Sequence, residues 1–396
     1  MLTFDARPAD GAPRAGVHAL VIGVSSYPHL PGGSAAQPGS AAAGLGLTQL
    51  AAPALTAYRV HQWLIDHREE LPVPLHTVRL LLAPSAEELD AEPSIGRPPA
   101  GQPTHAGIRA ALNDWRADLA RFAKSMAFFF YSGHGLGGTG EDALMLAADF
   151  GDPAVELLDR AVSITDVEQG MAPPRPGGAR TIGRRQVYFV DACRNRPPGL
   201  TADTARVPTV WDEQVDTAEA DRELAILLAT INGQQAYVGA PREATVFGQA
   251  LLECLDGAAA EAAEPDGSIR WSVSTATISS RLPERMEERT AQLRVRQSFR
   301  PGRQLMPIRL VTFAETPRVE VTFPVTGATP AANLRVDLSD LSGVTSFNPL
   351  ELPVRAHPVP MGHYGIVARA VVPPPTEERR AVRTLRPPRH EFAVDL

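Results

Sequence analysis

Two side chains capable of nucleophilic chemistry follow two hydrophobic stretches of the sequence. His134 lies in "YSGHGLGG" (131–138), and Cys193 lies in "YFVDACRN" (188–195). Cysteine attacks as its thiolate, but an unperturbed thiol has a pKa of about 8.5 and is mostly protonated at neutral pH. A neighbouring imidazole removes that limitation by taking the proton. The two residues could therefore attack a carbonyl carbon together, if the fold brings them side by side.

The elements around these residues predict that His134 and Cys193 lie close together. The stretches before His134 and Cys193 (125–131 and 186–192) are apolar and are typical of buried strands. Ligands of an open parallel sheet gather at the carboxyl ends of its strands, where both residues lie. Strands alternate with amphipathic helices, which favours a mainly parallel sheet covered on both faces. Further strands are expected at 18–27, 77–83, 142–149, 223–231 and in "PIRLV" closing the sheet, with helices at 53–66 and from an N-cap at Thr104.

The pattern changes near residue 313. Before it, residues 17–312 are expected to form one α/β domain, with a large part at 17–196, a connecting loop at 197–222 and a small part at 223–312. After it, residues 313–396 alternate apolar and polar side chains between turn signals. That alternation predicts a small C-terminal antiparallel β-sandwich.

Composition narrows the classes of partner and compartment. The 396 residues carry a net charge of −7, which gives no electrostatic reason to expect nucleic acid or an anionic membrane as a partner. Two cysteines, Cys193 and Cys254, are too few for a disulfide framework or a cysteine-rich metal site, and Cys254 is expected to lie on a helix face that packs on the core. No stretch has the length of a signal peptide core or a membrane span, so we expect a cytoplasmic protein.

The motifs resemble the caspase–metacaspase superfamily of cysteine peptidases. "YSGHG" and "DACR", each after a hydrophobic strand, carry the resemblance, and "ALVIGVSSY", "PTHAGIRAAL" and "VFGQALLECL" follow that family's order. The resemblance covers about residues 17–312. It implies a caspase-like α/β fold and a cysteine endopeptidase acting on protein or peptide substrates without a cofactor. His134 would be the general base or acid, Cys193 the nucleophile, and the backbone N–H groups of Gly135 and Cys193 the oxyanion hole.

The resemblance also implies which substrate residue precedes the cut. Asp191 and Ser132 stand two positions before the nucleophile and the histidine, where metacaspases line the first specificity pocket. A buried carboxylate needs a cationic partner, so Asp191 predicts cleavage after Arg, and secondarily after Lys. Many metacaspases carry a second pocket aspartate in a Gly-Cys-x-x-Asp stretch. The matching stretch here, "AAPALTAY", has Pro53 and Thr56 instead.

Acidic residues also bear on calcium, which many metacaspases require. Asp142, Asp149 and Asp152 lie in the corresponding region. Calcium takes six to eight oxygen ligands, and the sequence does not supply an evident full set. We therefore predict no metal site and leave calcium dependence open.

The loop at 195–222 lies where caspase-like enzymes are commonly processed. Arg206 and Arg222 would suit a basic-specific enzyme cutting itself, or an upstream activating protease, so the chain could be a zymogen. The loop could equally be a passive insertion.

The sequence allows two other interpretations of the whole chain. The Ala-, Pro- and Arg-rich composition is typical of a bacterial source, and bacterial relatives by resemblance act in stress, cell-death or antiphage systems. A catalytically idle caspase-like scaffold, binding a partner through its C-terminal β domain, is the main alternative. A nucleotide-binding protein is disfavoured, because "GHGLGGTG" lacks the Lys-Ser/Thr of a phosphate-binding loop.

Overall fold

The computed structural model describes most of the chain as two compact units. One unit consists of Met1–Leu252 with Ser274–Leu310, and the other of Glu253–Val273 with Val311–Leu396. The domain boundary predicted at residue 313 stays a prediction; in the structure the second unit also takes in 253–273. The described residues are 1–138, 142–174, 181–195, 207–213, 222–230, 242–263, 270–293, 297, 299–327, 329–341, 346–351, 356–371 and 378–395.

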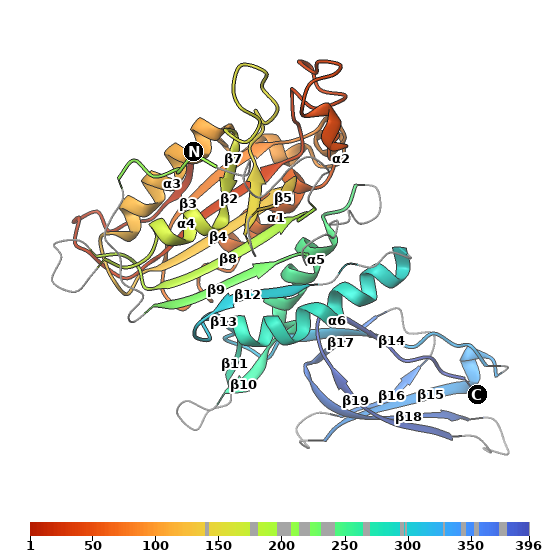
Figure 1. Cartoon of the computed structure of the whole chain (residues 1–396). Helices are drawn as coiled ribbons and strands as arrows, with labels where there is room; N and C mark the ends of the chain where they lie inside the picture. The colour runs from red at the N-terminus through yellow and green to blue at the C-terminus, as the bar shows by residue number, and fades with distance from the viewer. Residues whose placement is uncertain are drawn as a thin grey trace. The chain divides into compact units, whose positions relative to one another are not determined.

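A seven-stranded sheet forms the centre of the first unit (Figure 1). Its order is β1-β3-β2-β4-β8-β9-β12, and the five inner strands all run parallel. Only the edge strands β1 and β12 are antiparallel to their neighbours. The predicted mainly parallel α/β sheet is therefore confirmed. The strands are β1 (Leu2–Asp5), β2 (Val17–Val24), β3 (Leu75–Ala83), β4 (Met126–Gly133), β8 (Arg185–Ala192), β9 (Glu223–Leu228) and β12 (Arg300–Gln304).

Helices cover both faces of this sheet, which is why its inner strands are apolar throughout. The apolar stripe of α3 (His105–Leu119), with Trp115 at its centre, belongs to one buried cluster with Phe129 and Tyr188. Side chains alternate along a strand, so the neighbouring positions face the other side, where α1 (Pro53–Asp66) packs on β2, β3 and β4. Thr104 accepts from the N–H of Gly107 and confirms the predicted N-cap of α3. The other helices are α2 (Ala86–Ala91), α4 (Ile164–Gly170), α5 (Val246–Glu253) and α6 (Thr275–Leu293).

Two predicted strands belong to other sheets than expected. The stretch at 142–149 forms β6 in a separate antiparallel sheet, and "PIRLV" forms β13, which pairs with β11 rather than closing the main sheet. The closing strand is β12, "RPGRQ", which has no apolar pattern because an edge strand needs only backbone pairing. These sheets consist of β5 (Gly135–Gly137), β6 (Ala143–Leu146) and β7 (Ala161–Ser163), and of β10 (Glu261–Ala263), β11 (Arg270–Ser274) and β13 (Arg309–Thr312).

The C-terminal region forms two small sheets. On β15, Leu334, Val336 and Leu338 are buried while the residues between them are half-buried, as the alternating sequence predicts. All strand pairs are antiparallel except β14 with β20, so the predicted antiparallel sheets are confirmed with this one departure. The strands are β14 (Arg318–Thr322), β17 (His357–Pro360) and β20 (Arg389–Glu391), and β15 (Leu334–Asp340), β16 (Ser346–Glu351), β18 (Gly362–Ala370) and β19 (Glu378–Leu385).

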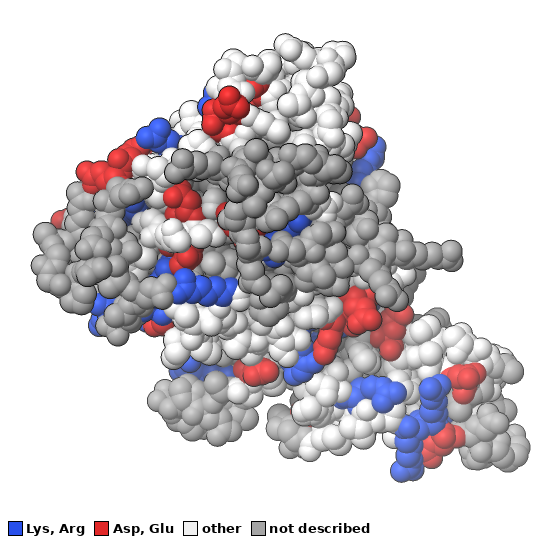
Figure 2. Space-filling view, in the orientation of Figure 1, with Lys and Arg blue, Asp and Glu red and all other residues white. Residues whose placement is uncertain are grey.

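The described part of the chain contains no helix with the length and apolar character needed to cross a membrane. On the face shown in Figure 2, the described basic and acidic side chains lie interspersed. Along α6, Arg281 forms an ion pair with Glu284 at 3.0 Å.

Candidate active site

Strands β4 and β8 bring His134 and Cys193 to the same edge of the sheet. The two strands are parallel neighbours, and their last paired residues are Gly133 and Ala192. His134 and Cys193 each come next in the chain, on strands that lie about 4.8 Å apart in a sheet. Further on, the N–H of Gly137 donates to the carbonyl of Asn195 at 3.0 Å, so the two stretches continue together. Both residues therefore follow the carboxyl ends of neighbouring strands, as the sequence predicts.

Gly135 allows this close approach. A Cβ atom at this position would lie 2.6 Å from the carbonyl oxygen of Cys193 and 2.7 Å from the Cβ of Ala192. Any side chain would therefore push the histidine loop away from the cysteine. The oxyanion hole that the resemblance assigns to the N–H groups of Gly135 and Cys193 stays a prediction.

Two tyrosines hold the backbone of His134. The N–H of His134 donates to the hydroxyl of Tyr27 at 2.8 Å, and the hydroxyl of Tyr131 donates to the His134 carbonyl at 2.7 Å. The ring of Tyr27 also lies 4.9 Å from the imidazole, centre to centre. Burial raises the pKa of both phenols, so they stay neutral hydrogen-bonding groups. Neither tyrosine is predicted from the sequence, because a tyrosine in or next to an apolar stretch gives no sign of what its hydroxyl binds.

A backbone carbonyl orients the imidazole. Nε2 of His134 lies 2.6 Å from the carbonyl oxygen of Thr48. A carbonyl only accepts, so Nε2 carries the hydrogen and Nδ1 is the acceptor of the neutral ring. Burial lowers the pKa of His134, against the smaller opposing effect of the Thr48 bond. The ring is therefore neutral at pH 7 and can take a proton at Nδ1.

Cys193 is partly exposed and forms no disulfide. Cys254, by contrast, is fully buried, as its position in an apolar helix predicts. Only the first of the two thiols is therefore reachable by a substrate.

Asp191 is buried beside these residues with an unusual set of partners. The hydroxyls of Ser132 and Thr245 both donate to its Oδ2, at 2.8 and 2.5 Å. Its Oδ1 is buried and has no hydrogen-bond partner among the described residues. Burial raises the pKa of Asp191 to about 6, although both hydroxyls lower it. At neutral pH the site thus contains an ionised carboxylate with one oxygen unsatisfied.

Thr245 connects Asp191 to α1, and sequence reasoning missed it. Its backbone N–H donates to Oγ1 of Thr56 at 2.9 Å, and Oγ1 of Thr56 donates to the carbonyl of Ala52 at 2.7 Å. Gly248 permits this contact, since a Cβ there would lie 2.1 Å from a methyl group of Thr56. Thr56, the position at which the resemblance implies a second pocket aspartate in metacaspases, is therefore linked to Asp191 through Thr245 and is uncharged. A threonine before a helix is usually interpreted as an N-cap. The sequence therefore gives no sign that the hydroxyl of Thr245 also donates to Asp191.

The aspartates considered for calcium bind other side chains of the protein. Asp142 accepts from the hydroxyl of Ser163 at 2.7 Å. Asp149 and Asp152 face the guanidinium of Arg160, at 3.3 and 3.9 Å. Within the described ranges, no three His, Cys, Asp or Glu side chains form a group that could hold a metal ion.

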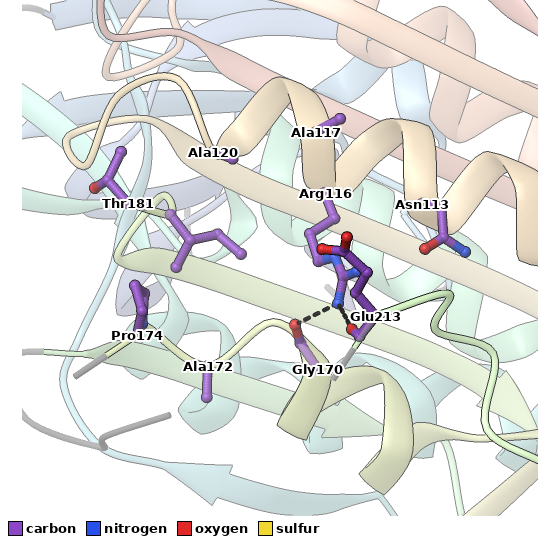
Figure 3. A pocket seen from close by; sticks show the side chains of 10 residues that line it. Asn113, Arg116, Ala117, Ala120, Gly170, Ala172, Pro174, Thr181 and Glu213 are labelled. Atoms are coloured by element: carbon purple, nitrogen blue, oxygen red, sulfur yellow. Dashed lines mark hydrogen bonds between the residues drawn. The ribbon is translucent and has the colours of Figure 1, made fainter. Parts of the chain in front are cut away.

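Part of the 195–222 loop is packed against α3 and α4. In the described segment 207–213, the indole N–H of Trp211 donates to the carbonyl of Asp166 at 2.8 Å. The guanidinium of Arg116 lies 4.4 Å from the Trp211 ring and donates to the carbonyl of Glu213 at 3.0 Å. A cavity of about 380 Å³ opens beside Arg116 (Figure 3), and neither His134 nor Cys193 lines it. This segment is anchored to the fold and is not a loose connection.

The two arginines considered as processing sites have different outcomes. Arg206 lies outside the described residues. Arg222 is 4% exposed, ion-paired with Glu168, and donates to Oε1 of Gln186 at 2.7 Å. A protease must bind an extended, accessible segment, so Arg222 does not offer a cleavage site in this structure.

Comparison with known protein families identifies the family of this chain. A peptidase family model described as the caspase domain matches residues 82–297, more than half of the chain, and includes His134, Asp191 and Cys193. Among solved structures, the chain is similar to caspase-1 from Spodoptera frugiperda, at 10% identity and a TM-score of 0.39, with 78% of this chain and 97% of that chain covered. No curated protein matches. By the family match, the chain belongs to the caspase-domain family of cysteine peptidases.

Proposed function

We propose that this protein is a cysteine endopeptidase that cleaves protein or peptide substrates after Arg, and more weakly after Lys. The observation that supports the proposal is the buried carboxylate of Asp191 beside the candidate nucleophile, with Oδ1 unsatisfied among the described residues. A cationic side chain entering from a substrate would supply the missing donor and neutralise the charge. An acidic side chain would add a second negative charge and be rejected.

The chemistry follows from the neutral His134. Nδ1 takes the thiol proton of Cys193, and the thiolate forms a C–S bond to the substrate carbonyl. The resulting oxyanion is held by the N–H groups of Gly135 and Cys193. His134 then returns the proton to the leaving amine as the C–N bond breaks. A water molecule, deprotonated by the same ring, then attacks the thioester carbonyl. The C–S bond breaks, the acid is released and the proton on His134 returns to the sulfur of Cys193.

Arg is preferred over Lys for a geometric reason. Only one oxygen of Asp191 is available, because Ser132 and Thr245 occupy the other. A planar guanidinium offers several donors in fixed directions, whereas an ammonium is a strongly hydrated point charge that costs more to bury.

Control of the enzyme belongs to the same proposal. Processing in the 195–222 loop at Arg206, by the enzyme itself or by an upstream protease, would convert a zymogen to the active form. We place the protein in a bacterial stress, cell-death or antiphage pathway, in the cytoplasm. Incubating a Cys193→Ala chain with wild type should then give a cut after Arg206 that Arg206→Gln abolishes.

The test of activity is hydrolysis of fluorogenic peptides that differ only in a terminal Arg, Lys or Asp. We expect hydrolysis in the order Arg, then Lys, with none after Asp, and its loss in Cys193→Ala. Cys254→Ala is the matched control and should keep full activity. Hydrolysis that survives Cys193→Ala would contradict the assigned nucleophile. If no peptide is cut and Cys193 is not labelled by a thiol-reactive Arg peptide, the chain is instead a scaffold that binds a partner through its C-terminal β domain.

A further inference from the structure

The loop that carries Thr48 is held in place by the side chain of Gln49. Oε1 of Gln49 accepts from the N–H of Tyr27 at 2.8 Å, and Nε2 donates back to the Tyr27 carbonyl at 2.9 Å. The same Nε2 lies 3.3 Å from the carbonyl of Leu30 and 3.2 Å from that of Pro31. One amide thus pairs with both backbone groups of Tyr27 and faces three carbonyls of the 27–31 turn.

This amide joins two of the groups that contact His134. Thr48, the residue before Gln49, supplies the carbonyl that accepts from Nε2 of the imidazole. Tyr27 supplies the hydroxyl that accepts from the His134 N–H and the ring that lies against the imidazole. No other side-chain hydrogen bond among the described residues connects the Thr48 stretch to Tyr27. The backbone N–H of Leu50 also donates to the carbonyl of Ser25 at 2.9 Å, so this main-chain bond and the Gln49 amide together set the distance between the two contacts.

We propose that Gln49 is a positioning residue of the candidate active site, which acts through Thr48 to keep His134 in the tautomer with hydrogen on Nε2. The inference rests on the proposed function for its catalytic consequence, but its structural content does not depend on activity. If the Thr48 carbonyl moves, Nε2 loses its acceptor and the hydrogen is no longer confined there. A ring with hydrogen on Nδ1 cannot take the proton of Cys193 at that atom.

The chemistry of the amide explains why this position holds glutamine. Glutamate has nearly the same shape, but its carboxylate has no donor for the three carbonyls and would be repelled by them. Alanine removes both the donor and the acceptor. Neither change touches Asp191, Ser132 or Thr245, so binding of the substrate side chain should be unaffected.

The first test is kinetic. In Gln49→Glu and Gln49→Ala, kcat for an Arg peptide should fall by about 10- to 100-fold, because small displacements of a catalytic group have effects of this size. KM should stay within about twofold, since a positioning role acts on the catalytic step. The matched control is Gln62→Glu, on the exposed side of α1, which makes the same charge change and should leave both constants unaltered.

The second test does not require activity. In the full chain labelled with ¹⁵N-histidine, imidazole N–H correlations report the tautomer of His134, assigned by their loss in His134→Gln. Wild type should show hydrogen on Nε2, and the two Gln49 variants should show a mixture. A wild-type ring with hydrogen on Nδ1 would overturn the inference, as would an unchanged tautomer in folded Gln49 variants. A wild type that cuts no peptide but shows the expected tautomer shift would refute the proposed function and leave the positioning role intact.

Discussion

The two ends of strand β8 bury carboxylates in contrasting ways. Near its start, Glu168 is 5% exposed and ion-paired with the buried Arg222, while Gln186 accepts from the same guanidinium. Near its end, Asp191 is 2% exposed and receives only two neutral hydroxyls, both on one oxygen. The first carboxylate has its cation within the chain, and the second has none among the described residues.

This difference separates a structural carboxylate from a candidate binding group. Burying a charge is costly unless an opposite charge or a full set of hydrogen bonds compensates it. The Glu168 end meets that requirement when the chain folds. The Asp191 end does not, and Asp191 lies two residues from Cys193. We interpret the unsatisfied oxygen as the place that a substrate cation fills.

The largest effect should follow from removing the internal cation. Arg222→Met leaves Glu168 buried without its main partner and should lower the free energy of unfolding by about 3–5 kcal/mol. Adding Glu168→Gln should restore much of that loss, because no uncompensated charge then remains. Urea denaturation of the single and double variants checks this. Equal loss in both would mean that packing, and not charge, holds this end together.

At the other end of β8, neutralising the carboxylate should stabilise the protein. The pKa of Asp191 is about 6 when folded, above its ordinary value of 3.8, so the folded state binds the proton more tightly than the unfolded state. Wild-type stability should therefore fall as pH rises from about 4 to 6 and stay lower above that range.

Asp191→Asn removes this dependence. It should be more stable than wild type by about 3 kcal/mol at pH 8, and by little at pH 4. Urea midpoints at both pH values measure the difference. A constant difference across pH would show that Asp191 does not titrate as its burial implies. Asp191 would then not differ from Glu168 in carrying an uncompensated charge.

The smallest effect concerns the hydroxyls on Asp191. Thr245→Val removes one of the two donors and should reduce kcat/KM for Arg peptides by at least about tenfold, because a hydrogen bond to a charged group contributes about 1.5–3 kcal/mol. The apparent pKa of the Arg-dependent activity should also rise, since a bond that favours the ionised form is gone. Thr245→Ser retains a hydroxyl and should behave like wild type. If serine and valine have the same effect, shape alone determines the role of Thr245.

The sequence was sufficient for the elements that rest on strong local patterns. The stripe of α3, its cap at Thr104 and the apolar inner strands follow from periodicity and buried runs. The edge strand β12 could not be predicted, because "RPGRQ" pairs through its backbone and carries no apolar pattern. The separate sheet of β6 could not be predicted either, since a short apolar strand does not specify its neighbour.

Some residues of the candidate site can also be predicted from the sequence, and others cannot. His134, Cys193, Ser132 and Asp191 are found from their places after two strands and from the resemblance. The carbonyl of Thr48 and the amide of Gln49 are not, because a backbone acceptor has no sequence signature and the loop at 31–46 before them is a run of small residues. Contacts that depend on how distant loops fold together are visible only in the structure.

We propose that the buried carboxylate of Asp191 binds a cationic side chain of the substrate. The most direct test compares two peptides that end in Arg or in citrulline, which has the same shape without the charge. We expect wild type to cleave the Arg peptide at least about 100-fold faster in kcat/KM, equivalent to about 3 kcal/mol, and Asp191→Asn to bring the ratio close to one. An unchanged ratio in Asp191→Asn would contradict the account, because the discrimination would then lie elsewhere in the protein.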